Sequence, residues 1–227
     1  MPSIHRVAVV DDDDQAALTI IHALQDGKFE PYRQEAMGSV EELVASIMAG
    51  SDAAVCDHRL RYGAFADVSG AELASKLMRA DHPAILVTQY LDQYADVDIR
   101  QFRGNLPVVL RRDQADEPSE LRDAFAKCLL EIAKGRLDNR KPQRTLLRVE
   151  QITKINGEAV IDAVVHGWNP KDTVRFPMSL VHADDMASVK EQSTLSALTN
   201  LRAEEKVELF FEDVRVVQDP DEDDGLG

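Results

Sequence analysis

Cysteine, tryptophan and long apolar runs are scarce in this chain. Its 227 residues include two cysteines, Cys56 and Cys128, which lie in separate apolar segments without the spacing of a zinc site or a disulfide framework. No apolar stretch approaches the length of a membrane span, and no basic flank with an apolar core marks a signal peptide. These absences predict a soluble cytoplasmic protein with reduced cysteines and no membrane partner.

Positive charge is also in short supply. The chain has 26 Lys and Arg against 41 Asp and Glu, and its formal net charge is -15. Because neutralisation of phosphates by Lys and Arg supplies most nonspecific nucleic-acid affinity, no nucleic-acid partner is expected. The sequence also lacks a glycine-rich phosphate loop, a paired-histidine zinc motif and a nucleophile elbow, so independent enzymatic turnover is not expected.

What the first half does contain is four short apolar stretches that each stop at a polar residue. Residues 7–10 precede Asp11 and Asp12, 53–56 precede Asp57, 84–87 precede Thr88, and 106–110 precede Arg111. Ligands of open α/β sheets bind beyond the carboxyl ends of the strands, so these side chains are expected at one edge. Clustered carboxylates repel one another unless a hard cation such as Mg2+ neutralises them. The pattern favours phosphoryl chemistry.

Helical periodicity lies between these stretches. Segments 15–25, 39–50, 70–79 and 119–134 repeat apolar residues at helical spacing, 91–102 does so more weakly, and a further strand is expected near 31–36. Asp13 or Asp14 can cap the first helix, Ser39 the second, and Gly135 follows the last. Alternation of five strands and helices predicts an α/β fold, a flavodoxin-like doubly wound parallel five-stranded sheet. In that order the first and third strands are neighbours, which brings Asp11, Asp12 and Asp57 together.

These residues resemble the receiver domain of two-component response regulators, over roughly residues 4–135. The matching motifs are Val9-Val10-Asp11-Asp12, Val55-Cys56-Asp57, Leu86-Val87-Thr88 and Val109-Leu110-Arg111. Three features depart from the family: Arg111-Arg112 stands where it carries a lysine, Gln89 follows Thr88 where it prefers a small residue, and the loop at 58–70 is longer.

The resemblance implies a role for each matching residue. Asp57 would accept a phosphoryl group from a histidine kinase or phosphotransfer protein, Thr88 would donate to a phosphoryl oxygen, and Arg111 would pair with its charge. Mg2+ would be held by Asp11, Asp12, Asp57 and the backbone carbonyl of Arg59. His58, which follows Asp57, is expected to face solvent. The departures favour a rival reading, an adaptor with a receiver fold that binds protein partners without phosphorylation.

The second half has a different pattern. Residues 136–144 are polar and predict a linker between a receiver domain at 1–135 and a small β domain at 145–218. Strands are expected at 147–153, 159–165 and 173–181, with one or two more at 207–217 and a hairpin at Asn156-Gly157, forming an antiparallel sandwich or barrel. Residues 183–200 stay ambiguous between a surface helix and irregular structure. The tail 219–227 is acidic and predicts disorder.

The partners of the β domain are less well defined by the sequence. From Thr145 onward acidic residues outnumber basic ones by about two to one, so its output is expected to be contact with an unknown protein target rather than DNA binding. Trp168 lies in a Gly-Trp-Asn-Pro segment and either anchors a partner or folds back over the domain. Whether the chain forms a homodimer is left open.

Overall fold

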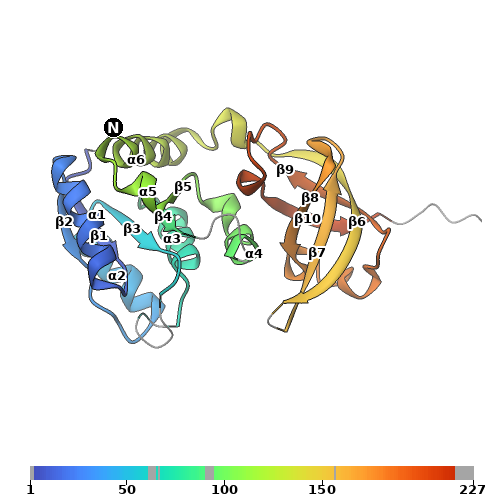
Figure 1. Ribbon diagram of the computed structural model, residues 1–227, viewed down its shortest axis with the longest axis horizontal. Helices are drawn as coiled ribbons and strands as arrows, with labels where there is room; N and C mark the ends of the chain where they lie inside the picture. Colours follow the sequence, from blue (N-terminus) through green and yellow to red (C-terminus); the bar gives the residue numbers. More distant parts are fainter. Residues whose placement is uncertain (1–2, 61–64, 66, 90–94, 156, 218–227) are drawn as a thin grey trace, which may run out of the picture. The chain divides into compact units, whose positions relative to one another are not determined.

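The computed structural model describes residues 3–60, 65, 67–89, 95–155 and 157–217 (Figure 1). The chain divides into two compact units, Met1–Arg140 and Lys141–Gly227. Four parts of the sequence prediction lie outside the described residues: the acidic tail, the start of the predicted helix at 91–94, part of the loop that follows Asp57, and Asn156 of the predicted hairpin. Within the described residues, no helix combines the length and apolar character needed to cross a membrane.

The first unit is built on a five-stranded parallel sheet with strand order β2-β1-β3-β4-β5. This order confirms the flavodoxin-like fold. The strands β3 and β4 are buried along their whole length, as expected for a parallel sheet covered on both faces by helices. The bounds are β1 Arg6–Val10, β2 Glu30–Arg33, β3 Ala53–Asp57, β4 Ala84–Thr88 and β5 Val109–Arg111.

The first two of the helices between these strands begin at caps that the sequence predicts, Asp13 and Ser39. The Asp13 side chain accepts hydrogen bonds from the first turn of α1, and Ser39 and Ser69 do the same for α2 and α3. Gly135, at φ +79°, follows the end of α6. The bounds are α1 Asp14–Asp26, α2 Val40–Gly50, α3 Gly70–Arg79, α4 Ala95–Arg100, α5 Arg112–Ala115 and α6 Pro118–Lys134, with 3-10 turns η1 at Arg103–Asn105 and η2 at Asp138–Arg140.

One of these helices has no counterpart in the sequence prediction. The helix α5 has four residues and follows β5 directly, so it is too short to show helical periodicity. Its first residue is Arg112, the second member of the arginine pair.

The polar segment 136–144 is more ordered than its composition suggests. Arg140 is buried, and its Nε atom lies 2.8 Å from Oε1 of Glu131 in α6. Its Nη2 donates to the backbone carbonyl of Gly104 at 3.0 Å. The first strand of the second unit already begins at Gln143. Composition could not indicate this, because the partners that bury Arg140 lie in other elements.

The second unit is a five-stranded antiparallel sheet of order β10-β9-β6-β7-β8. Its two outer strands approach each other, since the rings of Phe176 in β8 and Phe211 in β10 lie 4.7 Å apart. Val181, four residues beyond the end of β8, also forms an isolated bridge to Val214 in β10. The sheet is therefore curled into a partial barrel, one of the two predicted alternatives. The bounds are β6 Gln143–Ile155, β7 Glu158–Val165, β8 Asn169–Pro177, β9 Thr194–Thr199 and β10 Phe211–Val216.

Within this unit the structure corrects one expectation of the sequence and decides one alternative that it left open. Neither a surface helix nor irregular structure accounts for 194–199, which form a strand. The ambiguous stretch 183–200 contains the 3-10 turn η4 at Met186–Ser188 and the strand β9, which pairs with both β6 and β10. Trp168 folds back over the domain: it packs against the core, and its Nε1 donates to the carbonyl of Ala203 at 2.9 Å. The 3-10 turns η3 at Met178–Leu180 and η5 at Lys206–Glu208 occupy parts of the predicted strands.

Candidate functional site

The acidic residues predicted to converge do so at the carboxyl edge of the parallel sheet. The strands β1 and β3 pair with Val10 opposite Cys56, so Asp11 and Asp57, the next residue on each strand, reach the same edge. One carboxylate oxygen from each of Asp11, Asp12 and Asp57 lies within 4.8 Å of the others. Asp11 and Asp57 are 1% and 8% exposed, so their charges are largely removed from water.

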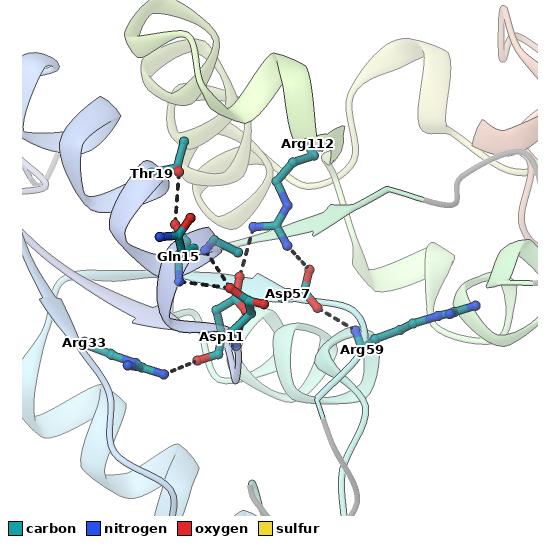
Figure 2. Close-up of polar contacts among 9 residues, drawn as sticks. Asp11, Gln15, Thr19, Arg33, Asp57, Arg59 and Arg112 are labelled. Atoms are coloured by element: carbon teal, nitrogen blue, oxygen red, sulfur yellow. Dashed lines mark hydrogen bonds and ion pairs between the residues drawn. The ribbon is translucent and has the colours of Figure 1, made fainter.

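Backbone amides fix the two buried carboxylates (Figure 2). Oδ1 of Asp11 accepts from the amide of Asp13 at 2.9 Å, in the turn that leads into α1. Oδ2 of Asp57 accepts from the amide of Arg59 at 2.8 Å, and the Arg59 side chain extends away from the acidic cluster. Each carboxylate therefore has one oxygen bound to its own loop and the other directed toward the cluster.

A guanidinium joins the two remaining oxygens. Nη1 of Arg112 lies 2.9 Å from Oδ2 of Asp11, and Nη2 lies 2.6 Å from Oδ1 of Asp57 (Figure 2). The family resemblance assigns the cationic role to Arg111, the last residue of β5. The structure gives these contacts to Arg112, one residue further along. The sequence shows two adjacent arginines, Arg111 and Arg112. Which of them reaches the carboxylates depends on where β5 ends and α5 begins, and only the structure shows this.

Thr88 lies at the same edge of the sheet. It is the last residue of β4, it is 1% exposed, and its strand pairs with β3 so that Val87 stands opposite Asp57. On its other side Thr88 stands opposite Arg111 of β5. The predicted hydroxyl thus reaches the edge that carries the carboxylates.

A second arginine supports the acidic loop. Nη2 of Arg33, at the end of β2, donates to the backbone carbonyl of Asp11 at 3.2 Å (Figure 2). Nη1 of Arg33 forms an ion pair with Asp14. The sequence analysis did not single out Arg33. Its position at the end of a strand adjacent to β1 was the available signal.

The electrostatics of the cluster leave Asp57 poorly stabilised as an anion. Burial, followed by the neighbouring negative charge of Asp11, raises the pKa of Asp57 to about 6. Arg112 and the amide of Arg59 oppose this rise by favouring the ionised carboxylate. The negative charges of Asp11 and Asp12 raise the pKa of Asp57 more than the single guanidinium of Arg112 lowers it, so an additional positive charge would stabilise the cluster.

The residues that follow Asp57 are packed more tightly than predicted. His58 is 5% exposed, which corrects the expectation that it faces solvent, and burial lowers the pKa of its imidazole to about 4. The amide of Gly70 donates to the carbonyl of His58 at 3.0 Å. A Cβ atom at Gly70 would lie 1.7 Å from the carbonyl oxygen of Asp57, so only glycine fits where α3 begins. This contact connects residues far apart in sequence and could not be predicted from it.

The donor set suits a hard divalent cation. Three carboxylates within coordinating distance of a common point are ligands that Mg2+ accepts, usually with water and a phosphate completing its shell. The carbonyl of Arg59 remains a predicted fourth ligand. Asp12 is half-buried, which leaves the cluster reachable from the loop side.

Comparisons with known proteins give similarity at the level of fold. No protein-family model matches the chain, and no curated protein matches it. A CheY-like response regulator receiver domain protein from Methanospirillum hungatei is 22% identical, with 59% of this chain and 100% of that chain covered and a TM-score of 0.42. A receiver domain from Clostridium thermocellum is 15% identical, covering 55% and 94%, with a TM-score of 0.41. The receiver domain of a Francisella response regulator is 17% identical, covering 55% and 96%, with a TM-score of 0.40.

Proposed function

We propose that the first unit is a signalling receiver in which Asp57 accepts a phosphoryl group from a phosphohistidine of a histidine kinase or phosphotransfer protein. The observation that carries the proposal is the convergence of three carboxylates, of which Asp57 ends a central strand and is held by a backbone amide. The four motifs of the resemblance occur in the expected order along the chain.

The proposed transfer uses side chains at one edge of the sheet. An oxygen of Asp57 attacks phosphorus, the O–P bond forms as the P–N bond to the donor imidazole breaks, and the imidazole keeps the bonding electrons. Thr88 would donate its hydroxyl hydrogen to a phosphoryl oxygen, and Arg112, released from the carboxylates, would pair with the transferred charge. Asp11, Asp12, Asp57 and the Arg59 carbonyl would hold Mg2+, which neutralises the carboxylates and the phosphoryl oxygens when bound.

The proposed output is protein contact through the second unit. In this proposal the chain has no independent enzymatic turnover, acts in the cytoplasm and binds neither membrane nor nucleic acid. The added charge on Asp57 would bias a two-state arrangement of the elements around Thr88 and Arg112, as charge switches do elsewhere.

A second candidate is the adaptor that is never phosphorylated. The observation favouring it is the Arg112 bridge, which already occupies one oxygen of each buried carboxylate. A site satisfied by its own arginine can serve as a structural element of a binding module.

The two candidates separate in one experiment. The full chain is incubated with Mg2+ and a small phosphodonor, and its intact mass is measured. The receiver proposal expects one phosphoryl group on the wild type and none on Asp57→Asn. The control Asp26→Asn removes an exposed carboxylate at the end of α1 and should react like the wild type.

The proposal fails if Asp57→Asn gains the same mass as the wild type. If neither protein gains mass, with this donor or with phosphorylated kinases, and both bind a partner equally, the adaptor reading replaces it.

A further inference from the structure

The most unusual feature of the acidic cluster is that its two buried carboxylates are fully occupied by donors from the chain itself. Asp11 binds one backbone amide and Arg112, and Asp57 binds one backbone amide and Arg112. All four oxygens of the pair therefore accept a hydrogen bond. Two of these donors are fixed by loop geometry, whereas the other two belong to one side chain that can rotate away.

We propose that Arg112 is a built-in counter-ion that holds the place of a divalent cation between Asp11 and Asp57, so that a metal ion binds there by displacing it. This inference rests on the proposed function and deepens it by assigning a specific competitor to the magnesium site. The guanidinium contacts the oxygens that face the cluster, Oδ2 of Asp11 and Oδ1 of Asp57. These are the oxygens that a shared cation would bind.

The burial of Arg112 supports a competing role. Its side chain is 18% exposed, and its Nε atom is buried without a hydrogen-bond partner among the described residues. Because its Nε–H donor is buried without an acceptor in the described part of the chain, the guanidinium of Arg112 is held in the cluster mainly by its contacts with Asp11 and Asp57. A cation that takes over those contacts removes the reason for the side chain to stay.

The position of Arg112 gives the competition a structural consequence. It is the first residue of α5, directly after β5, so its release frees the start of that helix. Metal binding and the conformation of this segment are then linked, and by reciprocity the arginine weakens the metal site as much as the metal weakens the arginine contacts.

The test is a titration of the metal-free full chain with Mn2+, followed by calorimetry and by the electron paramagnetic resonance signal of free Mn2+. Arg112→Gln should bind Mn2+ roughly tenfold or more tightly than the wild type, within the usual range of coupling between two ligands. Arg112→Lys keeps the charge but cannot bridge two carboxylates as a planar fork, so its affinity should lie between the two.

A control separates this effect from general electrostatics. Arg122→Gln removes one positive charge from the exposed side of α6 and should leave the Mn2+ affinity within about twofold of the wild type, because the charge is screened by solvent. A second readout is hydrogen exchange at Nε of Arg112 in the wild type, which saturation with Mg2+ should speed. The Nε–H signal is assigned as the one that disappears from the spectrum of Arg112→Lys.

Unchanged or weaker Mn2+ binding by Arg112→Gln overturns the proposal, since Arg112 would then be neutral to the metal or would support it. If Arg112→Gln does not fold, an Nε exchange rate in the wild type that Mg2+ leaves unchanged overturns it equally. Neither measurement involves phosphoryl transfer. A chain that shows the competition but gains no mass from either a small phosphodonor or phosphorylated kinases, and that binds a partner as well as Asp57→Asn does, would refute the proposed function and leave this inference intact.

Discussion

The two units of this protein differ in how deeply some of their charged side chains are paired. The parallel unit buries them: Asp11 and Asp57 share Arg112 at the sheet edge, and Glu131 and Arg140 form a pair whose side chains are 8% and 5% exposed. In the antiparallel unit Arg144 and Asp213 are both nearly half exposed, and the buried Asp162 pairs with an Arg175 side chain that is 42% exposed.

The difference follows from how each sheet is covered. Helices cover both faces of a parallel sheet, so polar groups from its strands gather at the strand ends, where they are partly out of water. The curled antiparallel sheet buries one face and exposes the other, so its charges can remain hydrated. Buried charges are costly to leave unpaired, and exposed pairs contribute little, so substitutions in the two units should have unequal effects.

The largest expected effect is at Gly70. Gly70→Ala places a Cβ atom 1.7 Å from a backbone oxygen of Asp57, and neither backbone can move without breaking the start of α3. We expect loss of more than about 4 kcal/mol, enough to unfold the first unit. Its counterpart is Gly167→Ala, which meets the mobile end of Leu201 at 2.7 Å and should cost about 1 kcal/mol.

Two spectroscopic signals report these outcomes separately. The α-helices of the described chain lie in the first unit, so far-UV circular dichroism follows that unit in a urea titration. The fluorescence of Trp168, the only tryptophan, follows the second unit. Retention of the full helical signal by Gly70→Ala would contradict the close packing between α3 and β3.

The second effect compares a buried with an exposed ion pair. Arg140→Gln leaves the buried Glu131 carboxylate without its main partner and should destabilise the first unit by about 3 to 5 kcal/mol. Arg144→Gln breaks an exposed pair with Asp213 and should change the stability of the second unit by about 0 to 1 kcal/mol. Urea midpoints measured by the same two signals test this, and equal losses would remove the contrast between the units.

The third effect depends on pH and concerns Asp57. Its pKa is about 6 in the folded chain against a model value of 3.8, so the folded state binds more protons between these values. Ionisation therefore costs folding free energy as pH rises through 6, by at most about 3 kcal/mol, and this cost vanishes below 3.8. In EDTA, Asp57→Asn should stabilise the first unit at about pH 8 and lose this advantage in acid.

The matched control for this prediction is the exposed Asp26. Asp26→Asn should shift the unfolding free energy by less than about 0.5 kcal/mol at either pH. An advantage of Asp57→Asn that is the same at both pH values would show that the carboxylate is not strained by burial.

The smallest expected effect is an absence of binding to DNA. The second unit, 141–227, has 17 acidic and 10 basic residues, and its arginines 144, 148 and 175 pair with neighbouring carboxylates. We expect no shift of genomic DNA by submicromolar protein at physiological salt. A shifted band would mean that the surface charges of this unit are arranged for phosphates despite their number.

The helices and strands of the first unit were predictable because local signals agree with the fold. Apolar strands of five residues, serine and aspartate caps and a terminal glycine each mark an element, and the structure confirms them. The strand β9 escaped prediction although Leu195 and Ala197 alternate with polar neighbours, since the residues before it are irregular. A strand of six residues contains only three repeats of the apolar–polar alternation, too few to be recognised next to irregular sequence.

At the site, the sequence by itself determined which residue types reach the edge of the sheet: strand ends carry Asp11, Asp57 and Thr88, and parallel strands bring their carboxyl ends together. The tertiary structure alone decided that Arg112 rather than Arg111 spans the carboxylates, that His58 is buried and that Gly70 admits no side chain. These outcomes depend on where a strand stops and on contacts between distant segments. Local pattern carries no information about such contacts, because their energy exists only once the chain has folded.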